Sequence, residues 1–321
     1  MKLYLFILAL IFNAPAFADS VALNAGVARI TFTAQSRSSE MLVWYPTETA
    51  EVSWQAGPFL IPASRNAEVA EGRFPVILLS HGGGPTGGTP LILLELSAAL
   101  ARHGFIVIAP FHGKAPLAMR TKQVVAAWQA VQENVRFQPH LDADRLGMIG
   151  FSLGGAVALE LAGAIPDIPH YLAYCAANPS DVMSCDHAPA DSEAPQRQAQ
   201  MELPSSLPRI SSVKALVLLD PFATLFSRSG LASVNQPTLL FRPVQSQLPA
   251  EANSANLMKD LPRSPELVSI PGGHFVFTDV CTPALLSAAG DICTDPAGIA
   301  DRAAIHRSAE RKIEAFFEQN L

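Results

Sequence analysis

The chain has little charge, and it lacks several features by which some functional classes are recognised. Charged residues make up 16% of its 321 residues, and the formal net charge is −6. No run of basic residues and no basic patch with interleaved aromatic side chains occurs, so nucleic acid is not expected as a partner. We find no phosphate-binding glycine loop, no heptad pattern and no internal repeat. No apolar run reaches the roughly 20 residues that a membrane-spanning helix requires.

The first 18 residues have the organisation of a secretory signal. Lys2 is followed by an apolar stretch over residues 3–12, and Ala16-Phe17-Ala18 forms a cleavage site of the A-x-A type. The apolar stretch is shorter than a bilayer span, and an uncleaved anchor is the alternative. We therefore expect a mature domain over residues 19–321 that is secreted or periplasmic and keeps no membrane anchor.

Cysteine is also scarce, and the four cysteines lie in two close pairs. Cys175 and Cys185 enclose one short loop, and Cys281 and Cys293 enclose another. Of the three possible connectivities, these local pairs are the simplest, and disulfides are favoured outside the cytoplasm. A zinc site that includes Cys185 and His187 is the alternative. Its spacing matches no common zinc cluster, so we predict neither a metal nor an organic cofactor.

Strand-like and helix-like segments alternate through the middle of the chain. Residues 91–103 and 121–137 have helical patterns, and residues 105–109 form a short apolar run between them. Such alternation predicts an α/β fold, with a mostly parallel central sheet covered by helices on both faces. Residues 28–33 and 41–44 are predicted to form an antiparallel pair at the start of the sheet.

The motif Gly150-Phe151-Ser152-Leu153-Gly154 follows an apolar run and leads directly into a helical pattern. It matches the G-x-S-x-G elbow, in which a serine lies on a strained turn between a strand and a helix. Bulky neighbours would collide with both elements, which explains the glycines. The free N–H groups at the helix start also favour developing negative charge. Ser152 is therefore the predicted nucleophile, and a chance match in a Gly/Ser-rich loop is the alternative.

A second motif, H-G-G-G at residues 81–84, directly follows an apolar, strand-like run. It resembles the loop that supplies N–H donors to an oxyanion. Acyl transfer needs two such donors, and glycines let the backbone approach the substrate. We assign the donors to Gly83 and to Leu153, the residue after the nucleophile. Gly82 and Gly84 remain alternatives to Gly83. A flexible loop without a role in catalysis is the alternative to the whole assignment.

Chain order selects the base among eight histidines. In this arrangement the order is serine, acid, histidine, so four histidines come too early: His81, His103, His112 and His140. Two more lie in an irregular segment, and His306 falls in a helical pattern over residues 298–321, where a solvated or packed role is expected. His274 remains, on a loop after the strand-like residues 266–270. It is the predicted base.

Two strand ends before His274 are positioned to supply the acid. Asp220 follows the apolar run 213–219, whereas the later run 237–241 is followed by no carboxylate before Glu251. We predict Asp220, whose role is to hold the imidazole in the correct tautomer and to stabilise the imidazolium. Glu251 is the rival acid, and a simple turn residue before proline is the alternative use of Asp220.

Two segments lack a regular pattern. Residues 50–72 are predicted to be an irregular surface excursion, and residues 165–212 lose periodicity amid Pro, Asp, Ser and Gln. We interpret the second segment as a cap-like insertion that shapes access to the site, with a disordered surface loop as the alternative. Phe275 and Phe277, beside the predicted base, are predicted to line an apolar acyl pocket, although Phe277 could equally belong to the core.

Together these motifs resemble the α/β-hydrolase superfamily, and most closely its secreted bacterial branch that is dienelactone-hydrolase-like and related to platelet-activating factor acetylhydrolases. The likeness covers nearly the whole mature chain and rests on five segments: Val43-Trp44-Tyr45-Pro46, Leu79-Ser80-His81-Gly82, residues 150–155, Leu219-Asp220-Pro221 and residues 273–277. The resemblance implies an α/β-hydrolase fold and places the acid after the strand next to the elbow, which favours Asp220. True dienelactone hydrolases have a cysteine where this chain has Ser152, so dienelactone is not the expected substrate.

The function expected from these features is that of a secreted serine carboxylic ester hydrolase. It would act on small or short-acyl esters through an acyl-enzyme intermediate, with a small-molecule ester as its partner. A phospholipid acetylhydrolase or a lipase-like enzyme is the first alternative. It is less favoured because no long amphipathic surface helix for membrane binding is evident. The alternative of another class is a hydrolase-fold binding protein that has lost activity.

Overall fold

The computed structural model describes residues 22–83, 87–185, 208–296 and 301–321. The predicted signal segment, residues 1–18, lies outside these ranges, and so do Gly84 and His187. No helix within the described ranges combines the length and the apolar character that crossing a bilayer requires.

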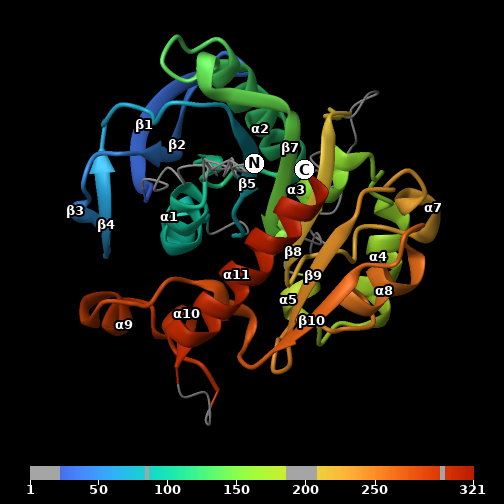
Figure 1. Cartoon of the computed structure of the whole chain (residues 1–321). Helices are drawn as coiled ribbons and strands as arrows, with labels where there is room; N and C mark the ends of the chain where they lie inside the picture. Colours follow the sequence, from blue (N-terminus) through green and yellow to red (C-terminus); the bar gives the residue numbers. More distant parts are fainter. Residues whose placement is uncertain (1–21, 84–86, 186–207, 297–300) are drawn as a thin grey trace, which may run out of the picture.

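The described part of the chain contains one sheet of ten strands in the order β10-β9-β8-β7-β5-β6-β2-β1-β4-β3 (Figure 1). Strands β6, β5, β7, β8, β9 and β10 run parallel, whereas β2 pairs antiparallel with both β6 and β1. This arrangement confirms the predicted mostly parallel α/β sheet with an antiparallel pair at its start. The strand bounds are β1 Asn24–Ala34, β2 Arg37–Thr47, β3 Val52–Ala56, β4 Phe59–Arg65, β5 Phe74–Ser80, β6 Ile106–Pro110, β7 Leu141–Phe151, β8 Val213–Leu219, β9 Thr238–Pro243 and β10 Glu266–Ile270.

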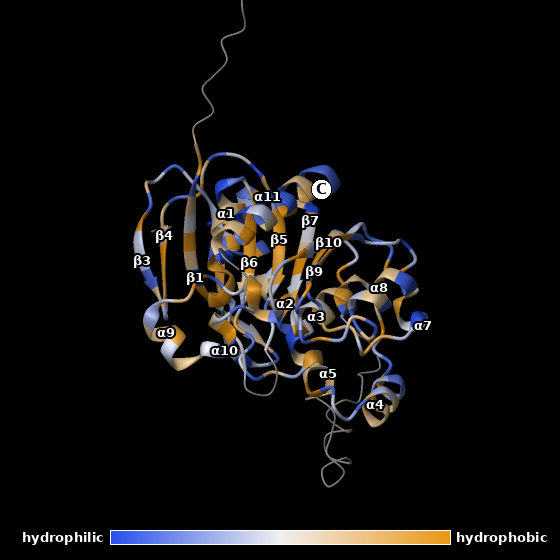
Figure 2. Cartoon of the chain, turned by 90° about the horizontal axis from the view of Figure 1, so that it is seen from below, coloured by the Kyte–Doolittle hydropathy of each residue, from blue (hydrophilic) through white to orange (hydrophobic). Residues whose placement is uncertain are grey.

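Helices cover both faces of the sheet and form a separate hydrophobic core on each face. Helices α2 (Leu117–Gln132) and α3 (Leu153–Ala162) pack on one face, and α1 (Leu94–Arg102) and α11 (Arg302–Asn320) pack on the other. Figure 2 shows the hydrophobic strands in the middle and hydrophilic segments at the periphery. The central strands are apolar where helices cover both of their faces, as over residues 146–151 of β7.

Residues 50–72 are not the irregular excursion that the sequence predicts. They contain the hairpin of β3 and β4, which extends the sheet beyond β1. In β4, buried and exposed residues alternate from Phe59 to Ala63, which is the period of a strand with one covered face. Trp54 of β3 packs on Trp44 of β2, with ring centroids 6.0 Å apart.

The predicted cap-like insertion contains two helices within its described part. Helix α4 (Ile168–Ala177) begins after Asp167, whose side chain accepts a hydrogen bond from the N–H of His170, and α5 (Val182–Cys185) follows. The prediction of irregular structure is therefore wrong for residues 168–177, which form a helix. Residues 186–207 of the insertion lie outside the described ranges.

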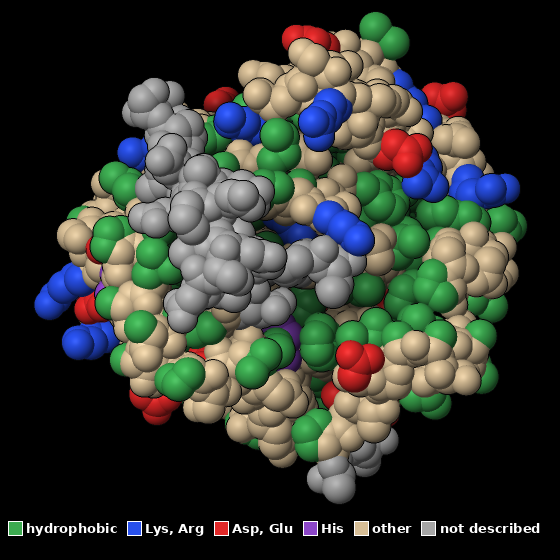
Figure 3. Space-filling view, turned by 180° about the vertical axis from the view of Figure 1, so that it is seen from behind, with side chains coloured by type: hydrophobic (Ala, Val, Ile, Leu, Met, Phe, Trp, Pro, Cys, Tyr) green, Lys and Arg blue, Asp and Glu red, His purple; other side chains and the backbone are tan. Residues whose placement is uncertain are grey.

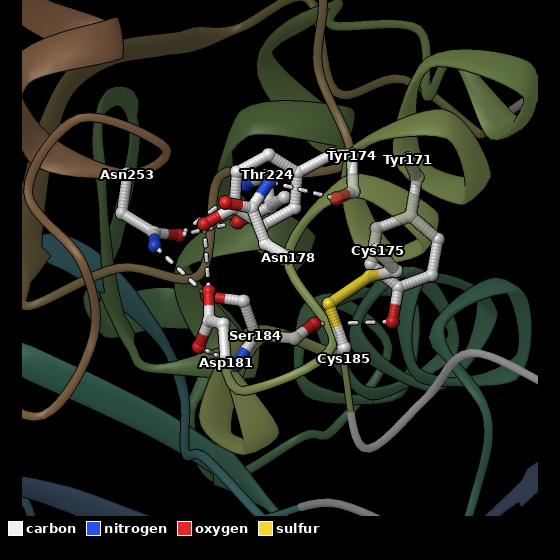
Figure 4. The surroundings of a disulfide bond; sticks show 9 residues. All are labelled: Tyr171, Tyr174, Cys175, Asn178, Asp181, Ser184, Cys185, Thr224 and Asn253. Atoms are coloured by element: carbon white, nitrogen blue, oxygen red, sulfur yellow. Dashed lines mark hydrogen bonds between the residues drawn. A yellow bond between two sulfur atoms is a disulfide. The ribbon is translucent and has the colours of Figure 1, made fainter.

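A disulfide joins the two helices of the insertion. Cys175 of α4 pairs with Cys185 at the end of α5 (Figure 4). This is one of the two local pairs that the sequence favours; the other, Cys281–Cys293, joins the segment after His274 to the end of α10.

Asn253 connects the insertion to the turn after Asp220. Its Oδ1 accepts a hydrogen bond from the N–H of Ala223 at 2.8 Å. The same Oδ1 accepts from the hydroxyl of Thr224 at 3.0 Å, and Nδ2 donates to Ser184 Oγ at 3.3 Å (Figure 4). The side chain is fully buried, so these bonds fix three segments relative to one another.

The remaining elements are short, and several of them surround the end of the sheet where the parallel strands finish. Their bounds are η1 Pro90–Leu93, η2 Gln138–His140, α7 Arg228–Leu231, α8 Ser254–Asp260, η3 His274–Phe277, α9 Pro283–Ala288 and α10 Gly290–Cys293.

Candidate functional site

Three predicted residues meet at the carboxyl edge of the parallel sheet. Ser152 follows β7, Asp220 follows β8, and His274 opens η3 shortly after β10. In open α/β sheets, ligands bind at this edge, because the loops after neighbouring parallel strands converge there. The fold therefore brings together residues that are as much as 122 positions apart in the chain.

Ser152 occupies a strained turn between β7 and α3. Its φ of 53° and ψ of −122° lie outside the regions that an L-residue ordinarily adopts. The backbone is held from the neighbouring strand, because Ser152 N–H donates to the carbonyl of Leu219 at 3.1 Å and its carbonyl accepts from the N–H of Phe222 at 2.9 Å. The elbow geometry predicted from the motif is confirmed.

The glycines around Ser152 stand where a side chain has no room. A Cβ on Gly154 would collide with the carbonyl of Ser80 at the end of β5, and one on Gly155 would collide with Pro221. The first turn of α3 therefore lies directly against two strand ends, as the argument from crowding expects.

His274 contacts both of its predicted partners. Its Nε2 lies 2.9 Å from Ser152 Oγ, and its Nδ1 lies 2.6 Å from Asp220 Oδ2. Because the carboxylate only accepts hydrogen bonds, Nδ1 carries the proton, which leaves Nε2 free to accept the serine hydroxyl. The imidazole is 2% exposed and is therefore held in one orientation by its surroundings.

Two phenylalanines pack against the imidazole, and a third lies behind them. The ring of Phe151 stacks on His274 with centroids 5.1 Å apart, and Phe275 meets it edge-on at 5.0 Å. Phe277 is buried in the core between Phe151 and Phe241. Phe277 therefore belongs to the core, which is the alternative that the sequence leaves open. It packs against the ring of Phe151, which in turn stacks on the imidazole.

Asp220 is buried and has three partners. Besides His274, its carboxylate accepts from Arg242 Nη1 at 2.9 Å and from the hydroxyl of Ser246. Arg242 therefore compensates the buried charge of Asp220, because burying a carboxylate without a partner costs free energy. Glu251, the rival acid, is exposed, and among the described residues it forms no hydrogen bond or ion pair with His274.

Sequence reasoning missed Arg242, which lies near the end of β9, and Ser246 and Gln247, which follow this strand. Gln247 Oε1 accepts the backbone N–H of His274 at 3.0 Å and so holds the start of η3. The sequence shows a polar segment here that lacks a carboxylate. The end of a strand that lies beside Asp220 can supply a cation and hydrogen-bond partners to its carboxylate, and the sequence analysis did not consider this.

The predicted oxyanion loop passes over the nucleophile. Gly83 has a φ of 101°, which favours glycine, and it follows the end of β5. A Cβ on Gly82 would lie 2.8 Å from Ser152 Cβ, so this backbone is in close contact with the serine. Leu153 opens α3 and is buried. The assignment of the N–H donors to Gly83 and Leu153 stays a prediction.

Comparison with known proteins agrees with the fold. The family model described as the alpha/beta hydrolase family matches residues 76–314. The chain belongs to the alpha/beta hydrolase family. Among curated proteins, no significant sequence match is found.

Solved structures of other alpha/beta hydrolases share the fold at low sequence identity. A ferulic acid esterase from Streptomyces cinnamoneus superposes with a TM-score of 0.61 at 18% identity, covering 96% of this chain and 92% of that one. A dienelactone hydrolase from Anabaena variabilis gives a TM-score of 0.53 at 15% identity, with coverage of 93% and 99%. A dienelactone-hydrolase-like promiscuous phosphotriesterase from metagenomic libraries gives 0.52 at 13%, with coverage of 92% and 99%. These neighbours share the fold of this chain, and membership of the family supports a hydrolase.

A cavity of about 580 Å³ lies between the insertion and the loop after β9 of this alpha/beta hydrolase. Tyr174 and Asp181 line it from the insertion, and Gln247 and Glu251 line it from the loop. Gln247 also binds the backbone of His274, so the cavity adjoins the histidine loop. In the view from behind, hydrophobic side chains gather around a recess in which a histidine side chain is visible (Figure 3).

A second group of titratable side chains lies behind the histidine loop. Glu95, Asp279 and His306 each have one potential ligand atom within 4.8 Å of the others. Their hydrogen bonds are structural, since Asp279 accepts from the N–H of Glu95 at the start of α1 and His306 Nε2 contacts the carbonyl of Val276 at 2.6 Å. Burial raises the pKa of Asp279 well above its ordinary range, which favours the protonated form. We interpret this group as a support of η3, in agreement with the packed role expected for His306.

Proposed function

We propose that the protein is a secreted serine carboxylesterase that acts on small or short-acyl esters. The observation that carries the proposal is the pair of contacts made by one imidazole, 2.9 Å to Ser152 Oγ and 2.6 Å to Asp220. A hydroxyl, an imidazole and a carboxylate in this relation form the arrangement that activates a serine for attack on a carbonyl carbon. Membership of the alpha/beta hydrolase family supports the reaction class.

In the proposed reaction, Ser152 Oγ attacks the ester carbonyl carbon while its proton passes to His274 Nε2. The imidazolium that forms keeps its Nδ1–H on Asp220, and the negative charge on the carbonyl oxygen is bound by the N–H groups of Gly83 and Leu153. The tetrahedral intermediate collapses when His274 protonates the leaving alkoxide, which departs as the alcohol. Water then attacks the acyl-enzyme with His274 as base, releasing the carboxylic acid and restoring Ser152. The scheme needs neither a metal nor an organic cofactor.

The lining of the cavity supports substrates with polar groups. The cavity beside the histidine loop includes the side chains of Tyr174, Asp181 and Glu251, and two of these are acidic. Such a lining fits hydroxyl-bearing or other polar alcohols better than a long alkyl chain. The two disulfides support an extracellular or periplasmic location.

A panel of esters tests this proposal, with Ser152→Ala as the blank. It would contain 4-nitrophenyl esters from acetate to palmitate, a simple lactone, methyl ferulate and a phosphotriester. We expect the highest kcat/KM for acetate to butyrate and no turnover above background for Ser152→Ala. Preference for long-chain esters in micelles would favour a lipase-like enzyme, and turnover of no substrate in the panel would favour the inactive binding protein.

A further inference from the structure

A buried arginine lies behind the oxyanion loop. Arg120 comes from α2, and its side chain is fully buried. Within the described ranges it forms no ion pair with a carboxylate. Its hydrogen bonds instead go to backbone carbonyls, two of them in the loop after β6 and three in the loop after β5: Gly113, Ala115, His81, Gly82 and Gly83.

This environment is unusual for a guanidinium group. Burial lowers the pKa of Arg120 to about 10, so the group is still protonated at neutral pH. A buried cation without a carboxylate partner costs free energy unless dipoles compensate it, and here the carbonyl oxygens do so. The charge therefore holds several peptide groups of two loops in one orientation.

The planarity of the peptide bond carries this orientation to the predicted oxyanion donor. The carbonyl of Gly82 and the N–H of Gly83 belong to one peptide unit, and the described chain contains no cis peptide bond. In a trans peptide the two groups point in opposite directions. Arg120 Nη1 binds the carbonyl of Gly82 at 3.2 Å, so the N–H of Gly83 is directed away from Arg120.

His81 holds the same carbonyl from a second side. Its Nδ1 lies 2.7 Å from the carbonyl of Gly82, and its Nε2 accepts the backbone N–H of His112 at 3.2 Å. Because Nε2 accepts, Nδ1 carries the proton and donates. Burial and the charge of Arg120 lower the pKa of His81 to about 3, so this histidine is neutral at neutral pH.

We propose that Arg120 is a positioning residue, which fixes the Gly82–Gly83 peptide so that the N–H of Gly83 is ready to receive the oxyanion. The inference rests on the proposed function, since it concerns the transition state of that reaction. Arg120 does not touch the substrate. It acts through three carbonyls of the oxyanion loop, which passes within contact distance of Ser152.

The test compares Arg120→Met and Arg120→Lys with wild type on the best short-chain ester. Losing one preorganised oxyanion donor lowers kcat by about 10²–10³-fold, and we expect a fall of this order for Arg120→Met with KM changed less than about threefold. Arg120→Lys keeps a charge, but its ammonium group cannot reach all the carbonyls. Its kcat should therefore lie between those of Arg120→Met and wild type. Arg73→Met is the matched control, because Arg73 also donates to a backbone carbonyl, that of Leu141, at the other end of the sheet.

A second readout separates positioning from simple loss of structure. A trifluoromethyl ketone binds as a tetrahedral adduct and needs the oxyanion donors, whereas the matching methyl ketone binds mainly without forming one. Affinity for the first should fall in parallel with kcat/KM in the Arg120 variants, and affinity for the second should not change. Equal losses for both ketones, or a folded Arg120→Met with wild-type kcat, would overturn the inference.

The variants and the wild type answer different questions. A wild type that hydrolyses no ester counts against the proposed function, whereas an active wild type with unaffected Arg120 variants counts only against the positioning role. If Arg120→Met does not fold, Arg120→Lys and the ketone pair still decide, and partial function of Arg120→Lys without selective loss of the trifluoromethyl ketone would contradict the proposal.

Discussion

In the half of the site formed by Ser152, His274 and Asp220, side chains make the contacts, whereas in the half formed by residues 81–83 the backbone makes them. The first half compensates the buried Asp220 with Arg242 at 2.9 Å, a pairing of one charge with another. The second compensates the buried Arg120 with carbonyl dipoles. A few direct partners are enough to orient catalytic side chains. To orient a backbone N–H donor, the protein has to fix the whole peptide unit that contains it.

The largest expected effect is on the side-chain half. Asp220→Asn should lower kcat by about 10⁴-fold, because the amide donates to Nδ1 and favours the wrong tautomer of His274. Steady-state kinetics on a short-chain ester would measure it. Glu251→Gln is the control and should change kcat less than about threefold, and a large loss in this control with none in Asp220→Asn would assign the acid to Glu251.

A third buried ionisable group, Glu160, sharpens the comparison because it has no partner among the described residues. Glu160 of α3 is buried, and neither of its carboxylate oxygens has a hydrogen-bond partner among the described residues. Burial raises its pKa to about 8. Between the ordinary pKa near 4.5 and this value, the unfolded chain loses the proton while the folded chain keeps it, so stability falls as pH rises through this window.

Glu160→Gln removes this titration. The variant should gain about 3–5 kcal/mol relative to wild type between pH 4.5 and 8, as measured by urea denaturation at several pH values. Glu133→Gln, at the exposed end of α2, is the matched control and should give a curve parallel to wild type. A parallel curve for Glu160→Gln as well would show that Glu160 is ionised in the folded protein.

The next effect concerns the support of the side-chain half. Asn253→Ala should destabilise the protein by about 2–4 kcal/mol, because it leaves the N–H groups of Ala223 and Thr224 buried without their acceptor. Asn256→Ala, in α8 directly after Asn253, loses a single bond to the carbonyl of Phe226 and should cost about 1 kcal/mol or less. Thermal and urea unfolding of both variants would compare them, and equal losses would remove the special role of Asn253.

The smallest expected effect is on the orientation of the histidine loop. Gln247→Ala removes the acceptor of His274 N–H and should lower kcat by about tenfold, which corresponds to about 1.4 kcal/mol for one hydrogen bond. Gln55→Ala, whose side chain bonds to Gly57 and Phe59 in the β3–β4 hairpin, is the control. An unchanged kcat in Gln247→Ala would show that the ring contacts with Phe151 and Phe275 suffice to orient the imidazole.

The sequence predicts the parts of the site whose geometry is written into a local motif. Ser152 and the H-G-G-G loop both follow apolar strands. A Cβ atom at Gly82, Gly83 or Gly154 would collide with neighbouring atoms, which explains the glycines of the two motifs. His274 follows from chain order. These predictions need no knowledge of which strands are neighbours.

The missed residues are those whose partners depend on the order of strands in the sheet. Arg242 meets Asp220 because β9 pairs with β8, and Arg120 meets Gly82 because α2 packs behind β5. Each side chain, taken in the sequence alone, is an ordinary arginine. The hairpin of β3 and β4 was missed for a different reason, since Pro62 lies inside β4 and proline disfavours the prediction of a strand.

Covalent labelling of the nucleophile tests the central claim most directly. A fluorophosphonate probe reacts with a serine that a neighbouring imidazole activates, and peptide mass spectrometry then locates the adduct. We predict a single adduct on Ser152 in the oxidised, folded protein and none on the Ser152→Ala variant. An unlabelled wild type, or equal labelling of Ser152→Ala at another serine, would contradict the account.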